Sequence, residues 1–290
     1  MSVGVVTDTN SGVLPEEARE LGLWALPMPF TIGDKEYLEG VDLSHERYYE
    51  LMESREDIRT SQPSPGSITD LWDEVLKERD ELIYIPMSSG LSGTCQTATM
   101  LAEDYDGRVQ VVDNQRISVT QRRSALDALA LAGQGRNAKE IKEILEREKF
   151  ASSIYITLNT LYYLKKGGRI TPAAAALGTV LRIKPVLTIQ GQKLDAFAKA
   201  RTMAGARQTM LSAMKNDLEK RFNGDVKSLY FYIAHTKNAE AAEDFSKEVR
   251  EAFGIEDVRI EPLSLSIATH IGPGSLAIAV SSVVPELKKT

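Results

Sequence analysis

Apolar and polar residues follow two different periods along this chain, and the way these periods alternate predicts its elements. Short apolar and β-branched runs, typical of buried strands, are separated by segments whose apolar residues recur at helical spacing. In the first half of the chain, strands and helices alternate, which predicts βαβ units and a parallel sheet. The strands expected there are residues 3–7, 24–32 and 108–112, together with a strand that opens at Leu82.

The pattern restarts near Phe150. Residues 183–189 and 194–200 flank Gln190-Gly191-Gln192 and predict a hairpin, so the second sheet should be mixed. We therefore expect an α/β protein of two domains. Residues 1–150 should form a three-layer α/β/α domain with a parallel sheet, and residues 151–290 an α/β domain with a mixed sheet.

The segment Leu82–Thr94 carries the first candidate chemistry. A buried strand runs into a turn rich in hydroxyl groups and glycine, with Ser88, Ser89, Ser92 and Thr94, and the turn opens a helix. The first amides of a helix lack internal acceptors and lie at the positive end of its dipole. This turn is therefore suited to bind a carboxylate or phosphate. The alternative is an ordinary strand-to-helix turn with serine caps.

Two further loops are candidates. The prolines of Thr60-Ser61-Gln62-Pro63-Ser64-Pro65-Gly66 predict an extended loop that holds Thr60 and Ser61 rigidly. A helix should begin near Ser67, with Asp70 completing a capping box. Asp8 follows the first strand, where α/β proteins often bind ligands, although a role as a turn or capping residue is the alternative.

Composition narrows the class of protein. Of 290 residues, 42% are hydrophobic and 26% charged, as in globular proteins. The net charge of -6 argues against a nucleic-acid partner. We expect neither a membrane-spanning segment nor a signal peptide, and the single cysteine, Cys95, fits a reducing compartment. We expect a cytoplasmic monomer with at most transient contact with a membrane surface.

An enzyme interpretation competes with anion binding. Gly90-Leu91-Ser92-Gly93-Thr94 nearly matches the G-x-S-x-G nucleophile elbow, with Thr94 in place of the last glycine. In this serine hydrolase alternative, His270 is the base, and Asp225 or Glu261 supplies the acid. A small-anion-binding protein is a third possibility. Neither metal-ligand spacing nor a nucleotide fingerprint is present in the sequence, so we expect no metal and no cofactor.

Several short motifs, in their order and spacing, resemble the DegV family over nearly the whole chain. They are Asp8-Thr-Asn-Ser, Thr60-Ser-Gln-Pro-Ser, Ser88-Ser-Gly-Leu-Ser-Gly-Thr, Val112-Asp-Asn, Lys166-Gly-Gly-Arg-Ile, Lys184-Pro-Val-Leu, Ala200-Arg-Thr and His270-Ile-Gly-Pro-Gly. The departures from the family pattern are Cys95, where an aromatic residue is common, Gly66, and the pair Arg122 and Arg123.

The resemblance implies a fatty-acid-binding protein with no catalysis of its own, whose acyl chain lies between two α/β domains. In family members studied as lipid-binding subunits of fatty acid kinase, a separate kinase phosphorylates the carboxylate of the bound fatty acid. By this resemblance, Thr60, Ser92 and His270 hold the carboxylate, with Ser61 and Ser89 close by. Arg169 and Arg201 match family arginines implicated in engaging the kinase.

Overall fold

The computed structural model describes residues 2–54, 57–169, 171–177, 183–191 and 193–288. The chain divides into two compact units. Unit 1 begins at the N-terminus, ends at Lys149, and also includes Ser264–Ser266 and the residues from Val284. Unit 2 contains Phe150–Leu263 and Ile267–Val283. The two short C-terminal segments of unit 1 lie in the part of the sequence that the prediction assigned to the second domain.

The main sheet of unit 1 is parallel, with the strand order β2-β1-β6-β7. Its strands are β1 (Val3–Asp8), β2 (Trp24–Leu26), β6 (Glu81–Ile85) and β7 (Val109–Val111). The helices of this unit are α1 (Pro15–Leu21), α2 (His45–Glu53), α3 (Pro65–Glu78), α4 (Thr94–Leu101), α5 (Ser118–Gly133) and α6 (Ala138–Arg147), with short 3-10 turns at η1 (Thr9–Ser11), η2 (Ala102–Tyr105) and η4 (Pro285–Leu287).

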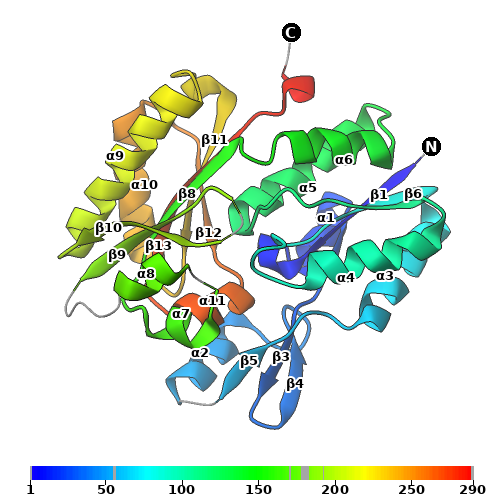
Figure 1. Ribbon diagram of the computed structural model, residues 1–290, viewed down its shortest axis with the longest axis horizontal. Coiled ribbons are helices and arrows are strands. Elements are labelled where there is room, and N and C mark those ends of the chain that lie inside the picture. The colour runs from blue at the N-terminus through cyan, green and yellow to red at the C-terminus, as the bar shows by residue number, and fades with distance from the viewer. Residues whose placement is uncertain (1, 55–56, 170, 178–182, 192, 289–290) are drawn as a thin grey trace. The chain divides into compact units, whose positions relative to one another are not determined.

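Alternating residues of the central strands build two separate cores. Val5 and Ile83 pack with residues of α1, α5 and α6, whereas Val6 and Leu82 pack with residues of α3 and α4. Because successive side chains of a strand point to opposite faces, both faces of this sheet are covered by helices (Figure 1). The predicted three-layer domain with a parallel sheet is confirmed.

A second, small sheet of unit 1 corrects the prediction of one strand at residues 24–32. The expected strand at 24–32 is two strands, β2 in the parallel sheet and β3 (Pro29–Ile32) in an antiparallel sheet of order β4-β3-β5. Pro27 follows β2 and Pro29 begins β3. Because proline has no backbone N–H to donate, it interrupts strand pairing between them. β3 pairs antiparallel with β4 (Lys35–Leu38). β5 (Ile58–Thr60), for which no strand was predicted, pairs with β3 and ends at the first residue of the expected loop.

Unit 2 contains a six-stranded mixed sheet of order β10-β9-β8-β13-β11-β12, in which β11 and β12 are parallel and the other pairs antiparallel. Its strands are β8 (Ser152–Thr157), β9 (Lys184–Ile189), β10 (Asp195–Ala200), β11 (Leu229–His235), β12 (Val258–Pro262) and β13 (Leu276–Ser282). The mixed sheet and the hairpin of β9 and β10 confirm the prediction.

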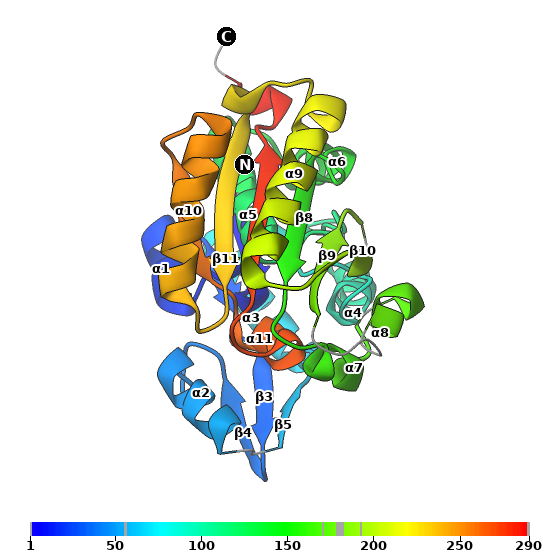
Figure 2. The same cartoon turned by 90° about the vertical axis from the view of Figure 1, so that its left-hand side faces the viewer.

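One face of this sheet packs against two long helices. The helices of unit 2 are α7 (Tyr162–Gly167), α8 (Pro172–Leu177), α9 (Met203–Arg221), α10 (Ala239–Phe253) and α11 (Leu265–Ile271, which starts within Ser264–Ser266), with a 3-10 turn at η3 (Val226–Ser228). Met210 and Met214 of α9 and Phe245 of α10 share a core with Ile233 and Ile278 of the sheet. Figure 2 shows α9 and α10 side by side on this face.

One helix boundary corrects the prediction. Ser64, not Ser67, caps α3 by accepting a hydrogen bond from the Ser67 amide. Thr202 caps α9, and Arg201 lies just before this cap. The segment that contains His270 forms α11, with His270 in its last turn.

Arg122 and Arg123 occupy positions of α5 where the helical period calls for apolar residues, and the structure explains both. Arg122 is 1% exposed and forms a two-pronged ion pair with Glu17 of α1. Arg123 pairs with the buried Asp127 one turn later, at 2.9 Å. Each guanidinium is compensated by a carboxylate, which allows it to be buried.

Candidate functional site

The turn between β6 and α4 is a compact network of hydroxyl groups and backbone amides. The amides of Leu91 and Ser92 donate to the Ser88 carbonyl at 3.0 and 3.2 Å. The Ser92 hydroxyl forms a 2.8 Å hydrogen bond with the Thr94 hydroxyl and accepts from the Thr94 amide at 3.2 Å. The expected strand, hydroxyl-rich turn and helix are present, although the helix begins at Thr94. Ser89 and Ser92 are both half-buried.

The strand that ends at Thr60 leads to the same turn. The side chain of Gln62, two residues after Thr60, donates to the Thr97 hydroxyl of α4 at 3.3 Å. A side chain at Gly93 would collide with the Gln62 carboxamide, 2.7 Å from the position of a Cβ atom, so glycine permits this approach. Within unit 1, the fold therefore brings the segment of Thr60 and Ser61 to the turn that carries Ser92.

Asp8 ties together the elements beneath this turn. Its carboxylate accepts hydrogen bonds from the Met87 amide, the Asn10 amide and the Gln121 side chain of α5, each at 3.0 Å. Asp8 is fully buried, and burial raises the pKa of its carboxyl group above the ordinary value, against the effect of these donors. It also caps η1, so the interpretation of Asp8 as a capping residue is confirmed.

In unit 2, His270 packs against a glycine of α7. A Cβ atom at Gly167 would overlap Nδ1 of His270, so the imidazole occupies space that glycine alone leaves open. Gly272 follows α11 with a φ of +75° and packs closely on the Tyr163 ring, which fixes the turn behind the histidine. Burial, and secondarily the charge of Arg169, lowers the pKa of His270 to about 4. The imidazole is therefore neutral at neutral pH.

The two arginines of the predicted docking surface are both exposed. Arg169 follows α7, and its guanidinium donates to the Gly167 carbonyl. Arg201 precedes the capping residue of α9. Both arginines therefore present a cation to solvent, while Arg169 also acts on His270 through its charge.

Ser92 lacks the geometry of a nucleophile elbow, which places a strained serine directly after a strand. Six residues separate Ser92 from the end of β6, and among the described residues the non-glycine positions with positive φ do not include Ser92. Asp225 lies before the amino end of β11. At the carboxyl end of β11, the Thr236 hydroxyl donates to the carbonyl of Gly272, two residues after His270. A strand of seven residues, roughly 20 Å long, separates that carboxylate from the region of His270.

Three buried or packed polar groups were missed by sequence reasoning. Glu39 is fully buried and accepts hydrogen bonds from Thr9 and from the Leu265 amide. Asn159 accepts from the Lys184 ammonium group at 3.0 Å and donates to the Pro273 carbonyl at 3.4 Å. The third group is Asp217 of α9. A polar residue in a helical period normally marks the solvent face, so the sequence offers no signal for its burial.

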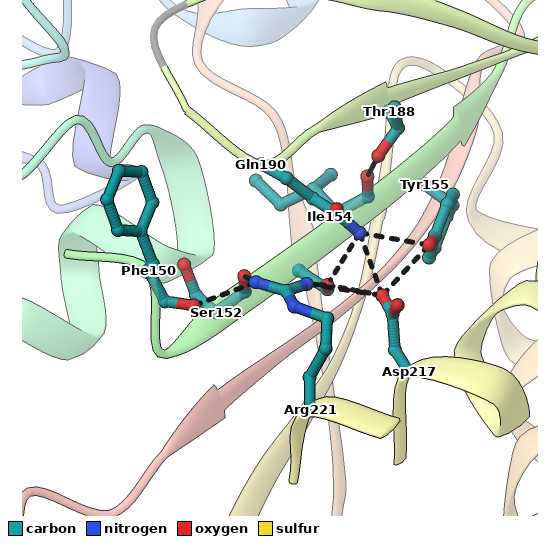
Figure 3. Close-up of polar contacts among 9 residues, drawn as sticks. Phe150, Ser152, Ile154, Tyr155, Thr188, Gln190, Asp217 and Arg221 are labelled. Carbon is teal, nitrogen blue, oxygen red and sulfur yellow. Dashed lines mark hydrogen bonds and ion pairs between the residues drawn. The ribbon is translucent and has the colours of Figure 1, made fainter. Parts of the chain in front are cut away.

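Figure 3 shows the cluster around Asp217. One carboxylate oxygen accepts from the side chains of Ser153, Tyr155 and Gln190 at 2.5 to 2.8 Å and lies 3.3 Å from the Arg221 guanidinium. Arg221 also donates to the carbonyls of Phe150 and Ser152, at the entry to β8. The cluster fastens α9 to the start of the mixed sheet.

Two features are absent from the described residues. No group of three or more histidine, cysteine, aspartate or glutamate side chains is arranged to hold a metal ion. None of the described helices combines the length and the apolar character needed to cross a membrane. Cys95 lies in the core beside α3, and burial raises the pKa of its thiol to about 12, so it stays protonated near neutral pH.

Comparison with known proteins places this architecture. A DegV domain-containing protein of Staphylococcus aureus is 28% identical over 276 residues, which cover 95% of this chain and 97% of the relative. A structure described as fatty acid binding of a DegV family protein from Thermus thermophilus matches with a TM-score of 0.88 and 29% identity, covering 98% of this chain and all of that one. The structure of DegV from Bacillus subtilis, described as a fatty acid binding protein, has a TM-score of 0.85 and 26% identity, covering 97% and 99%.

A family model described as "Uncharacterised protein, DegV family" matches residues 2–283, nearly the whole chain. The chain belongs to the DegV family.

Proposed function

We propose that this protein binds one long-chain fatty acid and presents it to a separate kinase, which phosphorylates the carboxylate to an acyl-phosphate. The observation that carries the proposal is the full-length similarity to the structures from Thermus thermophilus and Bacillus subtilis, both described as fatty-acid-binding. In this proposal, Thr60, Ser61, Ser89, Ser92 and His270 hold the carboxylate, while Arg169 and Arg201 face the kinase.

The local chemistry supports this assignment. The turn of Ser88–Thr94 lies after the carboxyl end of a parallel strand, where ligands of open α/β sheets bind. Its hydroxyl groups and the neutral His270 imidazole are able to donate hydrogen bonds to a carboxylate. An acyl tail adds roughly 0.8 kcal/mol per buried methylene, about 10 kcal/mol for a long chain before ordering costs.

The proposal is tested by what the protein carries. The purified protein, denatured and extracted, should release about one fatty acid per chain, identified by mass spectrometry. A released nucleotide or sugar phosphate, or no ligand even after incubation with fatty acids, would contradict fatty-acid binding.

The role of Ser92 has its own test. Ser92→Ala should weaken fatty-acid binding by about 1–3 kcal/mol, the range for a hydrogen bond to a charged group. Ser212→Ala, at an exposed serine of α9, is the matched control and should bind as the wild type does. A fluorophosphonate probe should leave Ser92 unlabelled; covalent labelling with ester turnover that requires both Ser92 and His270 would support the serine hydrolase instead.

A further inference from the structure

Glu39 is a buried carboxylate that holds the beginning of α11. It is fully buried, and Oε1 accepts from the Leu265 amide at 2.6 Å. Oε2 accepts from the Thr9 hydroxyl at 2.8 Å, and the same hydroxyl accepts from the Met28 amide at 3.1 Å. The Glu39 amide in turn donates to the Met28 carbonyl at 3.0 Å. The carboxylate is thus fixed in unit 1 by the loop after β1.

The partner of Glu39 is the first residue of the helix that carries His270. The amides of the first turn have no acceptor within the helix, and a negative charge is favourable at that end of the dipole. Leu265 begins α11, and His270 lies in its last turn. At 1.5 Å per residue, the amide and the imidazole are separated by about 8 Å of rigid helix. A shift at the start of α11 is therefore passed on to His270.

The surroundings of Glu39 allow its charge to change near neutral pH. The groups that contact the carboxylate from η1 and α11, Thr9 and Leu265, are uncharged. Among the described residues no cation pairs with it, and the charged group that acts on it is the Asp8 carboxylate at the end of β1. Burial, with the added repulsion from Asp8, raises the pKa of Glu39 to about 7.

Protonation changes what the side chain is able to accept. The ionised carboxylate accepts from two donors, Thr9 and Leu265, one on each oxygen. A protonated oxygen presents its own hydrogen to one of these donors, so one of the two hydrogen bonds is lost or reversed. The start of α11 is then held less firmly.

We propose that Glu39 is a positioning residue for fatty-acid binding, whose ionised carboxylate fixes the start of α11 and thereby the orientation of His270. This inference rests on the proposed function. It predicts that affinity for a fatty acid falls, beyond the effect of the ligand's own titration, as Glu39 becomes protonated.

The test compares palmitate affinity from pH 6 to pH 8 for the wild type, Glu39→Gln and Glu36→Gln. Titration of palmitate itself is common to all three proteins. The ratio of wild-type to Glu39→Gln affinity should therefore rise at least threefold between pH 6 and pH 8. Glu36, exposed on β4, is the matched control, and its variant should keep the wild-type profile. Thr9→Val, which removes one donor to the carboxylate, should move the midpoint to higher pH.

A second readout needs no ligand. Hydrogen exchange of the Leu265 amide, corrected for intrinsic exchange, should show protection that decreases below pH 7 in the wild type and stays constant in Glu39→Gln. Parallel affinity profiles, or protection independent of pH in the wild type, would overturn the role of Glu39. A wild type that binds no palmitate at any pH contradicts the proposed function, and the inference with it.

Discussion

Asp217 in unit 2 and Glu39 in unit 1 are both buried carboxylates, but their surroundings compensate them differently. Asp217 receives hydrogen bonds from Ser153, Tyr155 and Gln190 and has the Arg221 guanidinium at 3.3 Å. Glu39 receives two hydrogen bonds, and among the described residues it has no ion pair; its charged neighbour is another carboxylate. Burying a charge is costly unless it is paired and hydrogen-bonded.

This difference distinguishes a cluster that stabilises the fold from buried titratable groups that reduce its stability. The Asp217 cluster satisfies its charge and fastens α9 to β8, which is sufficient reason for its presence. Asp8 and Glu39 are buried, and among the described residues no cation forms an ion pair with either. Burial shifts the pKa of each, and that of the half-buried His270, towards the neutral form. Perturbed titratable groups of this kind are characteristic of functional sites.

The sharpest test of the structural side is Asp217→Ala. Removing this acceptor leaves several buried donors and a guanidinium without their partner, which should reduce the free energy of unfolding by about 2–4 kcal/mol. We expect a loss of stability at the lower end of that seen when a buried ion pair is broken, because the Arg221 side chain is a quarter exposed. Chemical denaturation measures the loss. Asp244→Ala, at an exposed pair on α10, should leave the midpoint unchanged; an equal loss in both variants would remove the distinction.

The uncompensated side is tested by the pH dependence of stability in Glu39→Gln. Because the pKa of Glu39 is raised in the folded state, the folded protein binds more protons than the unfolded chain between about pH 4.5 and pH 7, and stability conferred by this group falls as pH rises through that interval. The glutamine side chain of the variant does not titrate in this interval. Its stability relative to the wild type should therefore increase by about 3 kcal/mol from pH 4.5 to pH 8.

Stability is measured by urea denaturation at each pH, and the difference between the two proteins cancels the contributions of groups that do not interact with Glu39. Glu36→Gln should show a constant difference from the wild type. Parallel stability curves for the wild type and Glu39→Gln would mean that Glu39 is compensated as Asp217 is, and the comparison would fail.

A smaller effect is expected from Gly167→Ala, which should displace the His270 side chain without replacing the residue. The added methyl group would overlap the Nδ1 position of the imidazole, so the ring is displaced. Losing one hydrogen bond to a carboxylate should weaken fatty-acid binding about tenfold. Gly133→Ala, where a Cβ atom meets no neighbour within 4 Å, should bind normally. Unchanged affinity in Gly167→Ala would separate His270 from the carboxylate site.

The sequence predicted the elements well where period and burial agree. Successive residues such as Val5 and Val6, each buried on its own face of β1, reflect a strand covered on both sides. Such runs identified the strands, and their alternation with helices predicted the parallel sheet. Short elements escaped prediction because their stability comes from partners distant in sequence. β5 has three residues and exists by pairing with β3, and α11 has seven residues whose start is held by Glu39.

For the candidate site, the sequence located the hydroxyl-rich turn and the loop of Thr60, because serine, threonine, glycine and proline have local conformational preferences. It could not locate Glu39 or Asp217, since the burial of a carboxylate depends on three-dimensional surroundings. Nor could it explain Arg122, whose partner Glu17 lies on another helix. The assignment of individual side chains to the fatty acid and to the kinase stays a prediction.

The smallest effect concerns Arg169, which links the predicted docking surface to His270. Its charge is the second cause, after burial, of the lowered pKa of His270, whereas Arg201 is not among the causes. Arg169→Ala should therefore raise the pKa of His270 modestly towards its ordinary value, and Arg201→Ala should leave it unchanged. An NMR titration of the imidazole Cε1–H signals, assigned with His270→Gln, measures both.

If Arg169 also faces the kinase, as proposed, Arg169→Ala and Arg201→Ala should retain near-normal fatty-acid content and yet fail in kinase-dependent formation of acyl-phosphate. The planar guanidinium group of arginine suits a phosphate or an acidic patch. Its loss should therefore affect phosphoryl transfer by the kinase more than fatty-acid binding. The comparison of lipid content with phosphorylation rate separates the two roles. Should lipid content fall in step with phosphorylation, the arginines support the ligand site itself. Both guanidinium groups would then serve fatty-acid binding, and the docking assignment would be wrong.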